Sequence, residues 1–449
     1  MRGFDYRTAT EEEILHRAAL LEGMLLGDIP EARFSARHAR RGKGEVGLAI
    51  ETYFGIPPNP VPGADFPGAG IELKVVPLVR SDRRLKVKER TVISLIDYDS
   101  IVHETWKTAS VRKKLKILFV FFEHLRGRPK RQFPIHSVLL WQPEGEVEDR
   151  IHRDWETVRE KVERGLAHEL SEADGFILGP CTKGASSASL RTQPNSPVRA
   201  KSRAFALKPA FTFSLYAEPS APLTTGQLAE VFDLADLRRR FRRFVGRPID
   251  DVAAELAIRQ SRAKDYAARV VHRAVQASSS LPKADFKSIG PTVRMTRVND
   301  DLFPYEALSF PSFRHLELVE ETWEDSELLA RLEHMLIVPV LGPKRETPVG
   351  DCIIQEPVYW RPTAEQLSVI EEEWTMFHDL IAAGRAASLP TESQTRAIHV
   401  RPHGKDATDR DPTPGGGSEV RKSFWLNKRL VAALLTAAGT EVGSAQGAP

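Results

Sequence analysis

The sequence predicts an α/β protein in which helices pack on a mixed sheet and the whole unit occurs twice in tandem. Short apolar runs of strand length alternate with amphipathic helical segments in both halves of the chain. Sequence markers of the first half also return in the second half, in the same order and at nearly the same spacing. These two observations together fix the predicted fold class.

The helices of the first half are recognised by their caps and by their apolar stripes. Residues 8–26 begin with Thr8 or Thr10 as the N-cap, followed by acidic residues and an apolar stripe of helical period. A second helix is expected from Val46 to Phe54, and the remaining helical predictions are a helix start at 106–116 and an acidic helix at 144–167.

The strands of the first half are short apolar or alternating runs bounded by turn residues. They are expected at 71–76, 91–95, 117–122, 137–141, 175–180 and 204–216. Residues 181–197 are rich in Ser, Gly and Thr and are expected to form a loop.

The repeat rests on three pairs of markers and on one tryptophan in each acidic helix. The pairs are Ala64-Asp65-Phe66 with Ala284-Asp285-Phe286, Thr105-Trp106 with Thr322-Trp323, and Trp141 with Trp360, followed by Trp155 and Trp374. We therefore expect domains at 1–216 and 227–440, a linker at 217–226 and a flexible tail at 441–449.

The charge of the chain is nearly balanced, but its basic residues are clustered. The 449 residues carry a formal net charge of +3, which by itself does not indicate a nucleic-acid partner. A single basic run is usually a solvated face, whereas several runs near one acidic site favour a groove for a polyanion. The strongly basic runs are 80–90, 112–116, 126–131 and 238–243.

Two cysteines, Cys181 and Cys352, are too few for a disulfide framework or a cysteine zinc site, and neither is a candidate nucleophile. No uninterrupted apolar run of 18 residues occurs, so no membrane partner is expected, and the N-terminus lacks a signal-peptide pattern. We therefore expect a cytoplasmic protein.

The most informative stretch runs from Asp65 through a glycine-rich turn to Glu72 and Lys74. The period of two places Glu72 and Lys74 on one face of the predicted strand, and Asp65 is close enough to fold back beside them. Two acids and a lysine in this pattern are typical of metal-dependent phosphodiesterases: carboxylate oxygens hold Mg²⁺ and the ammonium orients water. The alternative is a surface ion pair on an edge strand, and the spacing alone favours that alternative.

Two further groups are open between a functional and a structural interpretation. Glu51, near the end of the second predicted helix, either faces the pocket of Asp65 or is an exposed helix carboxylate. The loop residues Lys183 and Arg191 either bind phosphates or base edges, or belong to a mobile surface loop.

The second half keeps the fold markers but loses the acids. Aligning the repeats places Thr292 at the position of Glu72, Arg294 at Lys74 and His272 at Glu51, whereas Asp285 keeps the aspartate. Because a second carboxylate is missing, the second half is expected to hold no catalytic metal. It would instead bind DNA, either a second DNA molecule or, as a clamp, the same duplex.

Several motifs together resemble one family. They are Lys43-Gly44-x-Val46-Gly47-x-x-x-Glu51, Asp65-Phe66-Pro67-Gly68-x-Gly70-Ile71-Glu72-Leu73-Lys74, and Thr105-Trp106-x-Thr108-x-x-Val111-Arg112-x-Lys114-Leu115-Lys116. In this order they resemble the MutH mismatch-repair nicking endonucleases and their relatives, the Sau-type restriction endonucleases that cut GATC. The resemblance covers residues 10–216 well and the second half weakly.

The resemblance implies a restriction-endonuclease-like core, present twice, that acts on double-stranded DNA with Mg²⁺. It implies that Asp65 and Glu72 hold the metal, with the carbonyl of Leu73 as a further ligand, and that Lys74 acts on the water. Glu51 and Lys114 become supporting site residues. The DNA-binding candidates that accompany this interpretation are Lys43, Arg112, Lys183, Arg191 and Arg401.

An active unit followed by a degenerate one resembles the arrangement of the Sau-type restriction endonucleases. We therefore expect a type II restriction endonuclease with a GATC site. The alternatives are a methyl-directed nicking enzyme and a non-catalytic DNA-binding protein. Gly179, Pro180 and Cys181 stand where the repair enzymes have a reading loop, and Ala206 replaces a tyrosine. Methylation sensitivity is therefore not carried over, and an oligomer on DNA remains an expectation.

Overall fold

The computed structural model describes residues 4–30, 44–57, 63–81, 84–125, 128–183, 190–217, 234–279 and 291–445. The chain divides into two compact units, Met1–Ala229 and Glu230–Pro449. Apart from Ala217, the expected linker lies outside the described residues. No helix in the described part of the chain is both long and apolar enough to cross a membrane.

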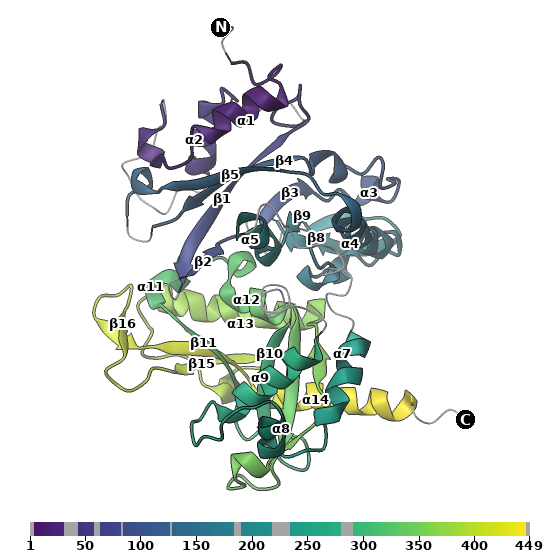
Figure 1. The fold of residues 1–449 in the computed structure, drawn as a ribbon, viewed down its shortest axis with the longest axis vertical. Helices are drawn as coiled ribbons and strands as arrows, with labels where there is room; N and C mark the ends of the chain where they lie inside the picture. Colours follow the sequence, from purple (N-terminus) through teal and green to yellow (C-terminus); the bar gives the residue numbers. More distant parts are fainter. Residues whose placement is uncertain are drawn as a thin grey trace. The chain divides into compact units, whose positions relative to one another are not determined.

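The main sheet of the first unit has four strands in the order β2-β1-β4-β5 (Figure 1). They are β1 (Glu72–Ser81), β2 (Arg84–Val87), β4 (Ile117–Glu123) and β5 (Ile135–Trp141). The pair β1–β4 is parallel, and β1–β2 and β4–β5 are antiparallel. The predicted mixed sheet is therefore confirmed.

Both faces of this sheet are covered, which explains why β4 is apolar from Ile117 to Phe122. Helices α1 (Glu11–Ala19) and α2 (Glu45–Tyr53) share a core cluster with Leu118 of β4. Phe119 points to the opposite face, where it packs against Trp141, and Trp141 in turn packs against Phe211 of α5 (Pro209–Ala217). Thr10 is the N-cap of α1 and forms a capping box with Glu13.

A smaller antiparallel sheet has the order β3-β9-β6, with β3 at Thr91–Leu95, β9 at Arg203–Leu207 and β6 at Leu178–Thr182. The hairpin of β7 (Leu190–Gln193) and β8 (Ser196–Lys201) lies between β6 and β9 along the chain. The remaining elements are α3 (Tyr98–Ile101), α4 (Gly145–Glu163) and the 3-10 turns Leu26–Asp28, Arg112–Lys114, Lys130–Gln132, Ala167–Glu169 and Glu172–Asp174.

The second unit repeats this plan. Its main sheet contains β10 (Thr292–Val298) parallel to β12 (Met335–Leu341), with β13 (Ile353–Ile354) and β14 (Val358–Trp360) antiparallel to β12. Its smaller sheet has the order β11-β18-β15, and a separate hairpin joins β16 to β17. These strands are β11 (Leu308–Phe313), β15 (Ile398–Pro402), β16 (Arg410–Pro412), β17 (Ser418–Val420) and β18 (Lys422–Leu426).

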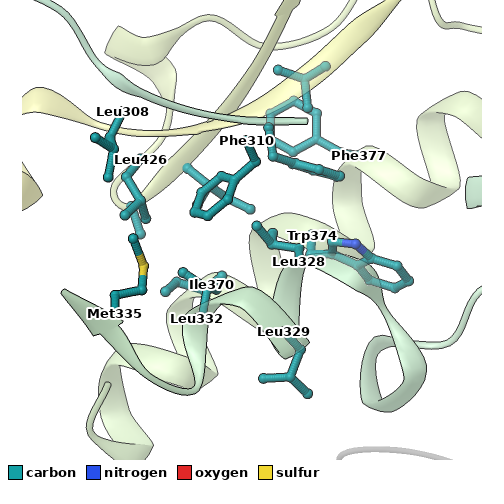
Figure 2. Close-up of a cluster of buried hydrophobic side chains, with 14 of the residues drawn as sticks. Leu308, Phe310, Leu328, Leu329, Leu332, Met335, Ile370, Trp374, Phe377 and Leu426 are labelled. Atoms are coloured by element: carbon teal, nitrogen blue, oxygen red, sulfur yellow. The ribbon is translucent and has the colours of Figure 1, made fainter. Parts of the chain in front are cut away.

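Some of the helices of the second unit, those that carry Leu318, Leu332, Phe377 and Val431, contribute to one apolar core. Figure 2 shows Phe310 inside this core, among side chains from strands and from the helices that carry Leu332 and Phe377. The helices are α7 (Leu234–Phe241), α8 (Ile249–Glu255), α9 (Tyr266–Ser278), α11 (His315–Leu318), α12 (Glu327–Leu332), α13 (Ala364–Ala382) and α14 (Lys428–Ala445). Four 3-10 turns complete it: Arg242–Phe244, Trp323–Asp325, Val349–Asp351 and Glu392–Gln394.

Strand register supports the sequence repeat residue by residue. Glu72 pairs with Ile117 across β1 and β4, and Thr292 pairs with Met335 across β10 and β12. Ile117 in turn pairs with Trp141, and Met335 pairs with Trp360. Each unit also holds a tilted tryptophan pair, with ring centroids 5.7 Å apart for Trp106–Trp155 and 5.8 Å apart for Trp323–Trp374.

Three predictions of secondary structure are wrong. Residues 106–116 form only the 3-10 turn at Arg112–Lys114, because side chains such as Glu104 and Thr108 bond the local backbone instead. The strand expected at 204–216 ends at Leu207, and Pro209 starts α5, as proline favours a first helical position.

The third wrong prediction is the loop at 181–197, which contains β7 and the start of β8. Asn195 lies in the turn between these strands with φ of 60°, a left-handed conformation that asparagine tolerates. At the C-terminus, α14 continues to Ala445, past residue 440, where the tail was expected to begin.

A buried carboxylate connects the long helix to the smaller sheet in each unit. Oδ2 of Asp154 in α4 accepts the backbone N–H groups of Phe176, Ile177 and Leu178 at 3.0, 2.8 and 3.0 Å. Glu373, at the same place in α13, accepts the N–H groups of residues 396–398. Both acids are buried and accept three backbone N–H groups each, so we assign them a structural role.

We expect Asp154→Ala to lower the free energy of unfolding by about 3 kcal/mol, because three buried N–H groups lose their acceptor. Urea unfolding followed by tryptophan fluorescence measures the change. Asp149→Ala, at an exposed position of the same helix, is the matched control. Equal stability of the two variants would contradict this role of Asp154.

Candidate active site

A tight turn brings Asp65 to the start of β1. The N–H of Phe66 donates to the carbonyl of Ile71 at 2.9 Å, which closes the turn. Gly70 has φ of +66°, and a Cβ on Gly68 would lie 2.8 Å from the carbonyl oxygen of Arg7. Both positions therefore require glycine.

Asp65 is fixed by the backbone of the strand. Its Oδ2 accepts the N–H of Leu73 at 2.8 Å. Burial raises the pKa of Asp65, the hydrogen bond from Leu73 opposes that rise, and the negative charge of Glu72 adds to it. The two carboxylates thus lie near enough to repel each other, as at a site built for a cation.

Glu72 is the centre of the charged group. It is 5% exposed, and its Oε1 accepts from Nζ of Lys74 at 2.9 Å and from Nζ of Lys114 at 3.3 Å. Its Oε2 is buried and has no hydrogen-bond partner among the residues that the structure describes. Leu73, between Glu72 and Lys74, packs into the core that includes α1 and α2, so its two neighbours project from the opposite face.

The free Oε2 of Glu72 fits a hard divalent cation, because a buried carboxylate oxygen normally has a donor or a metal as its partner. Asp65 supplies a second carboxylate beside it. Within the described ranges, no three His, Cys, Asp or Glu side chains are grouped so that they could hold a metal ion. Two carboxylates and the Leu73 carbonyl are therefore the candidate ligand set.

Glu51 comes to the same site from α2, which packs on β1. Burial raises the pKa of Glu51, the nearby charge of Asp65 raises it further, and Lys74 lowers it. Glu51 is half-buried. Glu51 is therefore near enough to feel the charges of Asp65 and Lys74, and it stays a candidate site residue.

Sequence reasoning missed the part played by Lys116. Its Nζ lies 2.8 Å from Oε2 of Glu11 and donates to the carbonyl of Ala69 at 3.2 Å. Lys116 thereby ties the first helix to the turn that carries Asp65. The signal available in the sequence was its place at the end of the motif Lys114-Leu115-Lys116, where only Lys114 is assigned a role in the site.

The DNA-binding candidates are more scattered. Arg112 pairs with Glu148 at 2.9 Å, and Arg191 is exposed on β7. The guanidinium of Arg401 lies 3.6 Å from the ring centroid of Trp425. Lys183 follows β6, and Lys43 lies outside the described residues. In the described part of the chain, no hydrogen bond or ion pair joins these residues to Asp65, Glu72 or Lys74.

The two cysteines are buried free thiols. Burial is the main cause that raises the pKa of Cys181 to about 12, which disfavours the reactive thiolate. This agrees with the expectation that neither cysteine is a nucleophile.

Comparison with known proteins places the chain in a family. A family model described as "DNA mismatch repair enzyme MutH" matches residues 54–154 and again residues 275–373. The DNA mismatch repair protein MutH of Serratia proteamaculans is 34% identical over 213 residues, which cover 46% of this chain and 92% of that protein. The chain belongs to the MutH family. Asp65, Glu72, Lys74 and Lys114 all lie within the first matched segment.

A second relative is longer than the MutH protein of Serratia proteamaculans. The type II restriction enzyme Sau3AI of Staphylococcus aureus is 29% identical over 307 residues, covering 64% of this chain. The match spans 63% of the length of that enzyme. The MutH protein of Pasteurella multocida is 32% identical over 184 residues, covering 40% of this chain and 82% of that protein. The two matched segments of the family model fit the tandem arrangement of the units.

We expect the protein to bind Mn²⁺ through Asp65 and Glu72, and Glu72→Gln to weaken this binding at least about tenfold because a charged oxygen ligand is lost. Calorimetric titration of the full chain measures the affinity. Asp149→Asn removes one exposed carboxylate and should leave the affinity unchanged. Equal binding by wild type and Glu72→Gln would contradict the assignment.

Proposed function

We propose that this protein is a Mg²⁺-dependent type II restriction endonuclease that hydrolyses double-stranded DNA at a short specific site. The observation that carries the proposal is the buried, unpartnered Oε2 of Glu72, beside Asp65 and two lysines. The Sau3AI relative, named as a type II restriction enzyme, supports this reaction class.

Asp65 and Glu72 would hold the cation, with the carbonyl of Leu73 as a further ligand. When bound, Mg²⁺ would polarise the scissile phosphate and offset the charge that develops in the transition state. The hydrogen bond from Leu73 to Asp65 and the ion pairs of Glu72 hold both carboxylates in place before DNA arrives. Such fixed ligands lose little entropy when the substrate binds.

Lys74 is the residue that would act on the attacking water. Its side chain is 21% exposed, and Glu72 holds its Nζ at the site through a bond of 2.9 Å. The ammonium would orient the water and neutralise part of the phosphate charge; alternatively Lys74, as the neutral amine, would accept a proton from the water. Lys114 supplies a second positive charge on the same carboxylate. The products would be a 5′-phosphate and a 3′-hydroxyl.

The resemblance to GATC-cutting enzymes makes GATC the proposed recognition site, and we propose that the second unit binds DNA as an effector or clamp. A second candidate function is a methyl-directed nicking endonuclease. It is favoured by the match to a MutH repair protein over 92% of that protein's length. Nicks in hemimethylated DNA without double-strand breaks would support the second function and contradict the first.

Lys74→Ala should reduce plasmid cleavage in Mg²⁺ at least about a hundredfold, because a positioned group that acts on the water is removed. Lys107→Ala, which removes an exposed lysine outside the site, should cut like wild type. Agarose gels of supercoiled plasmid over time measure the rates. An intact plasmid with the wild-type protein, or undiminished cutting by Lys74→Ala, would overturn the proposal.

Sequencing the ends of digested DNA tests the proposed site. We expect the breaks to map to GATC on both strands, with a phosphate on each 5′ end. If the ends share another short motif, that motif would replace GATC as the recognition sequence and the proposed restriction activity would stand. Ends without a common motif would contradict site-specific cleavage.

A further inference from the structure

The second unit presents the opposite charge at the place where the first unit has its acidic site. Thr292 occupies the position of Glu72 at the start of β10, and Arg294 occupies the position of Lys74. The backbone is the same: Glu72 N–H donates to the carbonyl of Lys116 at 2.8 Å, and Thr292 N–H donates to that of His334 at 2.7 Å. The carboxylate is lost, and a cation remains.

The second cation is kept as well. Arg331 of α12 follows Trp323 by eight residues, as Lys114 follows Trp106 by eight. Lys114 contacts the strand carboxylate of the first unit, whereas Arg331 pairs with Glu327 of its own helix at 2.7 Å. The alignment of the two repeats did not include Arg331, although its spacing from Trp323 identifies it as the counterpart of Lys114.

Arg294 lacks the anion that its counterpart has. It is half-buried, its Nε is buried without a hydrogen-bond partner, and its guanidinium lies 5.6 Å from the ring centroid of Phe310. Among the described residues no carboxylate forms an ion pair with it. Burial, and then the charge of Arg331, lower the pKa of Arg294 to about 10. Buried cations are normally paired, so within the described residues this guanidinium is short of one negative charge.

The neighbouring helix supplies no such charge. α9 packs on β10 as α2 packs on β1, and it places His272 where the first unit has Glu51. Withdrawal from water, and then the nearby charge of Arg294, lower the pKa of His272. Asp285, the counterpart of Asp65, lies outside the described residues.

We propose that Arg294, Arg331, His272 and Thr292 form a pocket that holds a backbone phosphate of DNA without cleaving it. A guanidinium binds two phosphate oxygens at once, and a half-buried one does so with little competition from water. Without a carboxylate at Thr292 the pocket lacks the metal ligand that cleavage needs. This inference names the contact through which the proposed DNA binding of the second unit would act, and so rests on that proposed function.

Duplex binding by the full chain in EDTA tests the pocket separately from cleavage. Titration of a fluorescent duplex gives the affinity and the number of duplexes per chain over a range of salt. Arg294→Gln should weaken binding about tenfold, or remove a second binding event, and should lower the slope of log K against log salt by about one. Arg345→Gln, at an exposed arginine of the same unit, is the matched control.

A second variant keeps the test decisive if Arg294→Gln fails to fold. Thr292→Glu restores the residue that the first unit has and gives Arg294 an internal carboxylate. It should raise the Tm and weaken duplex binding, while Gln260→Glu, which adds the same charge at an exposed position, should do neither. Duplex affinity and stoichiometry equal to wild type in Thr292→Glu would overturn the proposal.

Inorganic phosphate distinguishes a DNA phosphate from a free anion. If phosphate raises the Tm of the wild-type protein while the variants bind the duplex normally, the pocket serves a free anion and the DNA assignment is wrong. Failure of the nuclease proposal looks different. A wild-type protein that cuts no plasmid in Mg²⁺, yet loses duplex affinity through Arg294→Gln, would overturn the cleavage and support the pocket.

Discussion

The hydrogen bond from the Leu73 N–H to Asp65 is the contact on which the candidate active site depends. It joins the glycine-rich turn to the first residues of β1 and places one acid beside Glu72, which itself sits at the start of the strand. Glu72 cannot move away, because its backbone N–H is bonded to Lys116 and its Oε1 to two lysines. The remaining oxygen is therefore held ready for a cation.

The packing of the first unit keeps β1 in place. β4 pairs in parallel with β1 and is buried on both faces, so the strand that bears the site cannot shift its register without exposing a large apolar surface. Asp154 and Glu373 play the same structural part in the two units. Each uses one buried carboxylate to satisfy three N–H groups of the smaller sheet. These acids resemble catalytic groups in burial alone.

The two units show how a duplicated fold keeps its packing while its pocket changes charge. The tryptophan pairs, the long helices and the strand registers are retained because core substitutions cost several kcal/mol. The site residues are polar and do not belong to the apolar clusters, so Glu72 and Lys74 have Thr292 and Arg294 as counterparts without loss of the fold. In the proposed functions, the first unit offers oxygens to a cation and the second offers cations to an oxyanion.

The sequence by itself determined the fold class, the repeat, and the group of Asp65, Glu72 and Lys74, because hydrophobic period and spaced motifs are local properties of the chain. The sequence did not determine that 106–116 is not helical, because side-chain hydrogen bonds to the backbone decide that. It did not determine that 181–197 contains strands, because the sheet partners decide that. It also left open whether Glu51 lies near Asp65. The tertiary structure alone showed that, among the described residues, Oε2 of Glu72 and Nε of Arg294 are buried without a hydrogen-bond partner. Whether a buried polar atom has a partner depends on residues distant in sequence, which no local pattern records.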